Sequence, residues 1–182
     1  MHEDHNMRKF LLFFPLMICF LPLAPSSAAQ SMHDIILDAQ YKAAARFRVP
    51  VELLNAIMHV ESGGYPWALC LNLGNGRSMP IYPKTYYEAV QYLTMPRSDN
   101  IDIGPWQVNY RYIGKRLGVT KIQMLNPYVS SLLAAYKLSS EIAANGFTWH
   151  AVGNYHSYSL PLKIKYVAQV KKQLSKDGFK VN

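Results

Sequence analysis

The stretch from Pro50 to Gly64 places one acidic side chain on the apolar face of a predicted helix. Leu53, Ile57 and Glu61 lie four residues apart and share one face, and the neighbouring row is apolar as well. The proline at the start suits the first helical turn, and the two glycines at the end can supply the left-handed residue that stops the helix. Glu61 is therefore expected in the last turn, facing the interior.

An inward glutamate at this position has the properties of a general acid. Desolvation by apolar neighbours and the negative end of the helix dipole both disfavour the charged form of Glu61. A carboxyl group that stays protonated near neutral pH can donate a proton to a leaving group. The alternative is an ordinary glutamate whose head reaches solvent beyond the helix end, since glutamates are usually exposed.

A second stretch, Asp99 to Asn109, reads DNIDIGPWQVN and combines groups that suit sugars. Gly104 permits a close backbone approach, and Trp106 offers a flat apolar face. Gln107 and Asn109 carry amides that both donate and accept hydrogen bonds. The stretch is equally compatible with a turn that caps a helix.

A third stretch, Ala151 to Ser157, brings a phenol and an imidazole together near a predicted helix end. The hydroxyl of Tyr155 can orient a nearby carboxyl group. A buried structural tyrosine with a backbone partner is the alternative.

The charge balance points to an anionic partner. The chain has 182 residues, enough for one domain with a sizeable core, and a formal net charge of +8. Nucleic acid, a membrane surface and the bacterial wall all qualify, but no nucleic-acid motif is present, so nucleic acid is not expected as a partner. Basic residues near the C-terminus can attract an anionic wall or simply form a solvated helix face: Lys163, Lys165, Lys171, Lys172 and Lys176.

The N-terminus has the pattern of a secretory signal. Arg8-Lys9 precede the apolar run Phe10 to Leu23, and small residues follow, with cleavage expected after Ala29. The run is short for a bilayer-spanning helix, which needs about 20 apolar residues. The acids before Met7 are unusual in a signal, so translation is expected to start at Met7.

The predicted organisation is a signal peptide over residues 1–29 and one mature domain over residues 30–182, located in the periplasm with no stable membrane span after cleavage. Cys19 leaves with the signal, and Cys70 then stands alone, which excludes a disulfide framework. Cys70 is expected as a small buried side chain rather than a nucleophile.

The mature domain is predicted to be all-α, that is, mainly helical. Gly, Asn and Pro are frequent in residues 64–83, which are expected to form a long loop. No alternating strand pattern of useful length is present, although residues 101–108 can hold a short extended piece. The predicted helices cover residues 32–48, 50–63, 85–95, 108–117, 127–145, 148–155 and 161–176.

Taken in order, the three stretches resemble the soluble lytic transglycosylase family over about residues 39–170. AIMHVESGG is similar to its catalytic block, DIGPWQVN to its second block and AVGNYHS to its third. Asp102, Asn109 and the Tyr-His-Ser ending resemble the branch that serves type IV secretion, conjugation and type III secretion. Pro105-Trp106 differs from the usual Leu-Met, and His156 from the usual Asn.

The resemblance implies a lysozyme-like single catalytic domain that cleaves peptidoglycan. Glu61 is carried over as the acid. It would protonate the glycosidic oxygen between N-acetylmuramic acid and N-acetylglucosamine and then accept the proton of the muramoyl C6 hydroxyl, giving a 1,6-anhydromuramoyl end. The resemblance implies no cofactor and no metal, and a secretion or conjugation machine as a further partner. The substrate-binding residues carried over are Ser62, Ser98, Gly104, Trp106, Gln107, Asn109 and Tyr155.

Three alternatives stay open. A muramidase would hydrolyse the same bond with Asp99 or Asp102 as a second carboxylate, because glycoside hydrolases normally use two. A noncatalytic wall-binding factor would only recruit a secretion apparatus. A secreted nucleic-acid-binding protein is indicated by charge alone.

Overall fold

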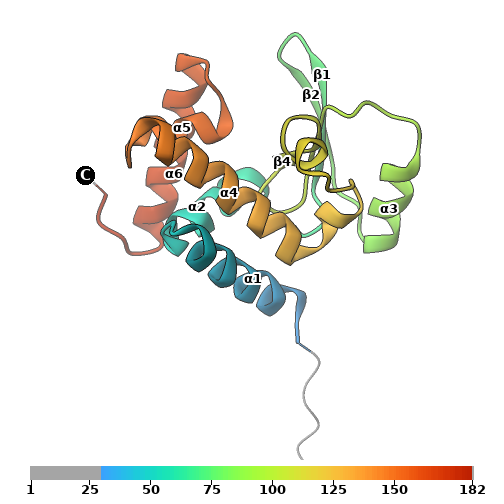
Figure 1. The fold of residues 1–182 in the computed structure, drawn as a ribbon, viewed down its shortest axis with the longest axis horizontal. Helices are drawn as coiled ribbons and strands as arrows, with labels where there is room; N and C mark the ends of the chain where they lie inside the picture. The colour runs from blue at the N-terminus through green and yellow to red at the C-terminus, as the bar shows by residue number, and fades with distance from the viewer. Residues whose placement is uncertain (1–29, 182) are drawn as a thin grey trace, which may run out of the picture.

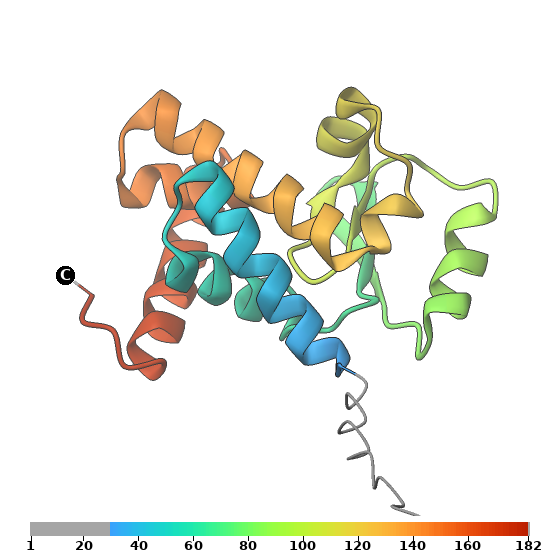
Figure 2. The same ribbon diagram turned by 60° about the horizontal axis from the view of Figure 1, so that its bottom comes forward.

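A computed structural model describes residues 30–181, so the predicted signal peptide lies outside the described residues. Helices gather on one side of the molecule, and a small sheet with one helix forms the other side (Figures 1 and 2). The α-helices and strands are α1 (Met32–Phe47), α2 (Val51–Ser62), α3 (Tyr86–Thr94), α4 (Pro127–Asn145), α5 (Trp149–His156), α6 (Leu160–Lys176), β1 (Leu69–Gly74), β2 (Arg77–Ile81), β3 (Ile101–Ile103) and β4 (Val108–Asn109). The fold is therefore mainly helical, as predicted, but it is not purely α.

The helices begin and end where the sequence signals lie. Ser31 and Asp34 form a capping box at the start of α1, and the Thr85 and Thr148 hydroxyls cap α3 and α5. Helix α2 stops at Gly63, whose φ of 66° is left-handed. These local signals need no tertiary help, which explains why the helix boundaries were predictable.

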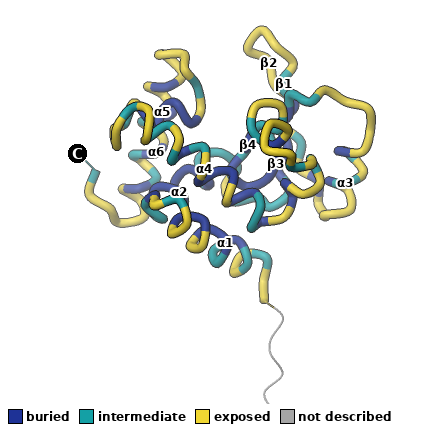
Figure 3. Tube along the Cα trace, in the orientation of Figure 1, coloured by how far each residue is buried: buried dark blue, intermediate teal, exposed yellow. Residues whose placement is uncertain are grey.

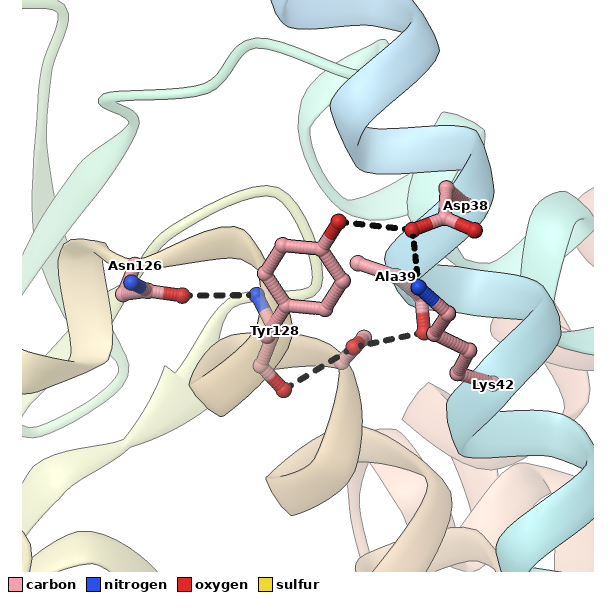
Figure 4. A network of polar contacts seen from close by, with 6 residues as sticks. Asp38, Ala39, Lys42, Asn126 and Tyr128 are labelled. Carbon is pink, nitrogen blue, oxygen red and sulfur yellow. Dashed lines mark hydrogen bonds and ion pairs between the residues drawn. The ribbon is translucent and has the colours of Figure 1, made fainter.

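Helices α1 and α4 are joined by a polar contact next to their apolar interface (Figure 4). The Tyr128 hydroxyl donates to Asp38 over 2.6 Å, and Lys42 pairs with the same carboxylate at 2.7 Å. The buried Ser131 hydroxyl donates to the Ala39 carbonyl at 3.0 Å. Helix α1 thereby holds the first half of α4, the long helix that reaches from the helical side toward the sheet (Figure 2).

The core runs through α2 and α4, which are largely buried, whereas the hairpin tip and α3 are mostly exposed (Figure 3). Leu54 and Ile57 of α2 are fully buried, and Leu138 of α4 and Val170 of α6 are fully buried as well. Helix α2 packs against α1 and α6, so its C-terminal end is fixed from both sides. A side chain in the last turn of α2 is thus carried by a largely buried helix.

The prediction that residues 64–83 form a loop is wrong, because this segment holds the hairpin β1–β2. The sheet is antiparallel throughout, in the order β2-β1-β3-β4, with Leu69 opposite Ile103 and Asp102 opposite Asn109. The strand β2 is exposed along most of its length and contains Pro80, and the β1–β2 register shifts near Gly74. An exposed strand has no apolar alternation, which is the signal that strand prediction needs. The extended piece expected within residues 101–108 is confirmed by β3 and the start of β4.

The predicted helix over residues 108–117 is confirmed as helical turns from residue 110 onward, but its first two residues and its α-helical type are wrong. Strand β4 comes first, then one π-helical turn, Tyr110–Gly114, and a 3₁₀ turn, Lys115–Leu117. The side chain of Asn109 caps this turn by accepting from the Tyr112 N–H at 3.2 Å. Gly114 lies so close to Met124 that a Cβ would come within 2.5 Å of its sulfur. Packing against Met124, which the local sequence does not reveal, therefore sets the geometry. A second 3₁₀ turn, Gln123–Leu125, leads into α4.

Within residues 30–181, every helix is too short or too polar to cross a membrane.

Candidate active site

A cleft of about 930 Å³ opens between the helical side and the sheet. Its lining comes from the end of α2, the β1–β2 hairpin, β3, β4 and the π-helical turn, and from α4, α5 and the loop that follows α5. All three sequence stretches with candidate chemistry reach this one cleft, through Glu61, through Asp102, Gln107 and Asn109, and through Tyr155 and His156.

Glu61 lies in the last turn of α2 and lines the cleft, with only 12% of its side chain exposed. One carboxylate oxygen is 3.9 Å from Nδ1 of His156, which is ion-pair range for a protonated imidazole but too long for a hydrogen bond. The His156 ring stacks on Tyr166 with centroids 4.7 Å apart. The prediction that Glu61 faces inward from the helix end is confirmed.

Two buried phenols lie in the field of Glu61. Burial, and then the negative charge of Glu61, raise the pKa of both Tyr155 and Tyr166 well above the ordinary value, so both hydroxyls stay protonated. The Tyr155 hydroxyl donates to the Trp106 carbonyl at 2.9 Å, which is the backbone partner of the structural alternative and not a carboxyl group. The buried Tyr166 hydroxyl faces the Glu61 carboxyl group, and this polar contact also contributes to the raised pKa of Tyr166. Tyr166 was not predicted, although its spacing with Val170 and Leu174 marks the buried face of α6.

Ser62 and Trp106 hold the site together from outside the cleft. The Ser62 hydroxyl donates to the Pro105 carbonyl at 2.7 Å and accepts from the Tyr65 N–H at 3.1 Å. The Trp106 indole is fully buried and donates to the Leu54 carbonyl at 3.0 Å. Neither side chain lines the cleft. Trp106 therefore does not offer its face to a sugar as predicted, because the core takes up its ring and α2 takes up its N–H.

Gly104 and Gln107 shape the loop between β3 and β4. Gly104 has a φ of +81°, and a Cβ there would lie 2.7 Å from the Ser130 hydroxyl, so the close approach predicted for Gly104 is to α4 and not to a ligand. Gln107 has a positive φ of 46°, and its amide nitrogen donates to the carbonyls of Gly104 at 2.8 Å and Ala68 at 3.1 Å. Its Oε1 has no donor among the described residues and is open to a ligand in the cleft.

Asp102 lies in the cleft wall between two amides. Asn72 donates to one oxygen and Asn109 to the other, both at 2.7 Å. Burial raises the pKa of Asp102, and these two hydrogen bonds and the charge of Lys137 only partly oppose it. Asn72 was not predicted because it comes from the hairpin that the sequence did not reveal.

Ser98 and Asp99 lie outside the cleft lining. Ser98 is exposed, and its hydroxyl accepts from the Asn100 N–H at 3.1 Å and from Arg111 at 3.4 Å. Asp99 pairs with Lys115 at 2.7 Å and Lys121 at 2.9 Å, and these hydrogen bonds lower its pKa to about 2. Of the two candidate second carboxylates, the structure thus brings only Asp102 to Glu61's cleft.

Lys137 is a cleft residue that the sequence reading missed. It is half-buried, lines the cleft from α4, and places its Nζ 4.3 Å from the centroid of the Tyr155 ring. Burial lowers the pKa of Lys137, while the charges of Glu61, Asp102 and Glu141 raise it. The available signal was that Lys137 is the only basic residue in the otherwise mostly apolar α4.

Glu141 and Cys70 are the remaining acidic and thiol groups of the cleft lining. Glu141 accepts from Asn154 at 3.0 Å and from the Tyr158 hydroxyl, and so ties α4 to α5 and the loop after it. Cys70 is half-buried in the cleft wall, and burial raises the pKa of its thiol. Within residues 30–181, His, Cys, Asp and Glu side chains nowhere form a group of three that could hold a metal ion.

Comparison with known proteins gives one kind of relative. The chain is similar to the invasion protein IagB of Salmonella typhi, with 27% identity over 134 residues, which is 72% of this chain and 69% of that protein. The invasion protein IagB of Salmonella typhimurium strain SL1344 is 26% identical over the same shares. No family model matches the chain. No solved structure matches it.

Proposed function

We propose that this protein is a peptidoglycan lytic transglycosylase with Glu61 as its acid. The observation that carries the proposal is the position of Glu61, nearly buried on the inner end of α2 and open to a large cleft that is lined by amides. The resemblance of the three sequence blocks gives the substrate, and the cleft has room for several sugar rings. The similarity to proteins named for invasion fits a role at the cell envelope.

The reaction needs one carboxyl group and no water. The Glu61 O–H would donate its proton to the oxygen between C1 of N-acetylmuramic acid and C4 of N-acetylglucosamine as the C1–O bond breaks. The C6 hydroxyl oxygen of the same muramoyl residue then bonds to C1, and its proton returns to the Glu61 carboxylate. The products are a free C4 hydroxyl and a 1,6-anhydromuramoyl end, and the acid is regenerated.

The remaining predicted residues divide into two groups under this proposal. Gln107 lines the cleft, and its Oε1, which accepts no hydrogen bond from the described residues, would contact the sugars directly. Asn109 also lines the cleft, but its amide donates to Asn100 and Asp102 and accepts from the Tyr112 N–H, so Asn109 would act as a positioning residue. Ser62, Gly104, Trp106 and Tyr155 would act as positioning residues, since their polar groups or close contacts are used within the protein. Ser98 belongs to neither group, because it lies outside the cleft lining.

Hydrolysis of the same bond is the second candidate, and the presence of Asp102 in the cleft favours it. A muramidase would need Asp102 as a nucleophile or base. Both Asp102 oxygens already accept short hydrogen bonds from amides, and burial favours its protonated form. The two hydrogen bonds occupy lone pairs that a base or a nucleophile would use, so we place the transglycosylase first.

The deciding experiment is mass spectrometry of the fragments that the protein releases from purified peptidoglycan, with Glu61→Gln as the matched variant. We expect anhydromuramoyl ends from the native protein and a loss of about 10²-fold or more in the variant, because a general acid contributes about that much. Reducing ends would show hydrolysis instead. Wall binding without any fragments would favour a noncatalytic assembly factor.

The cellular setting is part of the proposal. A signal peptide over residues 1–29 would deliver residues 30–182 to the periplasm, where local opening of the wall would make room for a secretion, conjugation or pilus apparatus. Fractionation of cells, with N-terminal sequencing of the exported protein, tests this route. An N-terminus at Gln30 is expected, and a protein retained in the cytoplasm would contradict it.

A further inference from the structure

The ammonium group of Lys137 has no anionic partner of its own. Among residues 30–181, no carboxylate oxygen lies within 4.0 Å of its Nζ and no acceptor is within hydrogen-bond distance, whereas Lys42, Lys115 and Lys121 all pair directly with aspartates. Its close contact is the face of the Tyr155 ring. A half-buried cation in a cleft, with its N–H donors left to solvent, is suited to receive a ligand group.

The surroundings hold this cation in the cleft without neutralising it. Glu61, Asp102 and Glu141 act on Lys137 only from a distance, and the oxygens of Glu141 and Asp102 are engaged by other donors. The cleft also contains Arg77 and Arg116, so its fixed cations and acids balance in number. An added negative group at Lys137 would therefore meet a cation that is not already paired.

We propose that Lys137 determines substrate specificity by binding a carboxylate of the glycan strand. This inference rests on the proposed function and goes beyond it. The hydroxyl and acetamido groups of the peptidoglycan sugars are neutral. An ammonium group therefore prefers the carboxylates that are attached to these sugars. One source is the lactyl group of a muramic acid that has lost its peptide, and the other is the peptide itself.

The test measures binding by calorimetry to the full chain carrying Glu61→Gln, which removes turnover. The probes are tetrasaccharides of alternating N-acetylglucosamine and N-acetylmuramic acid with free lactyl carboxylates, with those groups converted to methyl amides, or with stem peptides attached. We expect the strand with a matching carboxylate to bind about tenfold more tightly than the amide strand. The free-lactyl and stem-peptide arms identify which carboxylate is used.

Lys137 is then substituted in the Glu61→Gln protein. Lys137→Met keeps a long side chain and should remove the tenfold preference, with less than about a twofold change for the amide strand. Lys137→Arg should keep the preference, which separates loss of charge from loss of folding. Lys172→Met, on the exposed face of α6 and outside the cleft, lowers the net charge by the same amount and should keep the tenfold preference for the charged strand.

Two results would overturn the proposal, and they differ in what else they affect. Equal binding of charged and amide strands, or a preference that survives Lys137→Met, would remove the role of Lys137 and leave the transglycosylase intact. Absence of binding to every strand would remove the proposed function together with this inference.

Discussion

At the scale of residues, two neighbouring aspartates have opposite environments. Asp99 faces two lysines at the surface and has a depressed pKa, whereas burial raises the pKa of Asp102 in the cleft. A charged, solvated Asp99 outside the cleft cannot reach a sugar bound next to Glu61, while Asp102 can. We therefore expect different effects on activity when each of these two aspartates is replaced by asparagine.

We predict that Asp99→Asn keeps full activity and loses less stability in acid than the native protein. Because its folded pKa lies below the ordinary 3.8, the paired Asp99 stabilises the fold above that pH, and this contribution is lost as the pH falls toward 2. The group is largely solvated, so we expect less than about 1 kcal/mol at neutral pH. Urea unfolding at pH 7, 4 and 2 measures it, and a large loss of activity would instead return Asp99 to the catalytic site.

We predict that Asp102→Asn reduces wall cleavage but leaves the type of product unchanged. The substitution replaces one accepting oxygen by an NH₂ group. This donor would then face the donating amide of Asn72 or Asn109, so one of the two hydrogen bonds is lost. Fragment analysis should show fewer anhydromuramoyl ends and no reducing ends. A native protein that yields reducing ends, with all activity lost in this variant, would make Asp102 the second carboxylate of a hydrolase.

The residues that the sequence revealed are those whose signal is local. Glu61 interrupts an apolar helical row, so its position needed only the helix period. Lys137 and Asn72 reach the cleft through the packing of α4 and through a hairpin. Lys137 stands out locally only as the single basic residue of α4, which does not tell that it faces the cleft, and Asn72 gives no local signal. Trp106 was misjudged for a related reason, since a tryptophan face is equally suited to a sugar and to a core.

At the scale of elements, the loop between β3 and β4 is held against α4 by a glycine. Gly104 and Gly74 have nearly the same left-handed φ, +81° and +82°, but only Gly104 faces a crowded neighbour, the Ser130 hydroxyl. A Cβ at Gly74 would meet nothing within 4 Å. Alanine substitutions at Gly104 and Gly74 therefore separate two losses of stability, one from the left-handed backbone and one from close packing.

We predict that Gly104→Ala destabilises the fold by about 2–4 kcal/mol and Gly74→Ala by about 1–2 kcal/mol, because overpacking adds to the left-handed strain only in the first. Urea unfolding of the two variants measures the difference. Equal losses would show that the contact with Ser130 relaxes freely, and that α4 does not restrain this loop.

The helices were predictable as elements, and the sheet was not. Capping residues and apolar periods define α1, α3, α4 and α5 within a few residues of their observed ends. Strands β3 and β4 hold three and two residues, too few to show a period. Strand β3 is defined by its pairing with β1, and β4 by its pairing with β3. A strand defined by its partner gives no local signal.

At the scale of the whole molecule, the net positive charge belongs to residues 30–182. The two acids and two bases of residues 1–29 cancel, so residues 30–182 carry the same +8 as the full chain. Exposed lysines of α6 contribute to this charge away from the cleft. Long-range attraction to an anionic wall is therefore independent of the sugar contacts.

We predict that binding of the Glu61→Gln protein to purified peptidoglycan weakens several-fold between about 50 and 500 mM NaCl, because salt screens exposed charges. Binding to chitin, a neutral polymer of N-acetylglucosamine, serves as the control and should change little. Sedimentation assays measure both. A wall affinity that is insensitive to salt would show that the net charge plays no part in retention.

The carbonyls of Pro105 and Trp106 receive hydrogen bonds from Ser62 and Tyr155, and so connect the first and third sequence blocks through the second. Every residue type supplies a main-chain carbonyl, so this junction depends on the path of the backbone and not on the side chains that it carries. A chain with Leu-Met at these positions, as in the family that the three sequence blocks resemble, could make the same two hydrogen bonds. A change of side chain at Pro105 is therefore expected to matter less than one at Trp106, whose buried indole also donates to the Leu54 carbonyl.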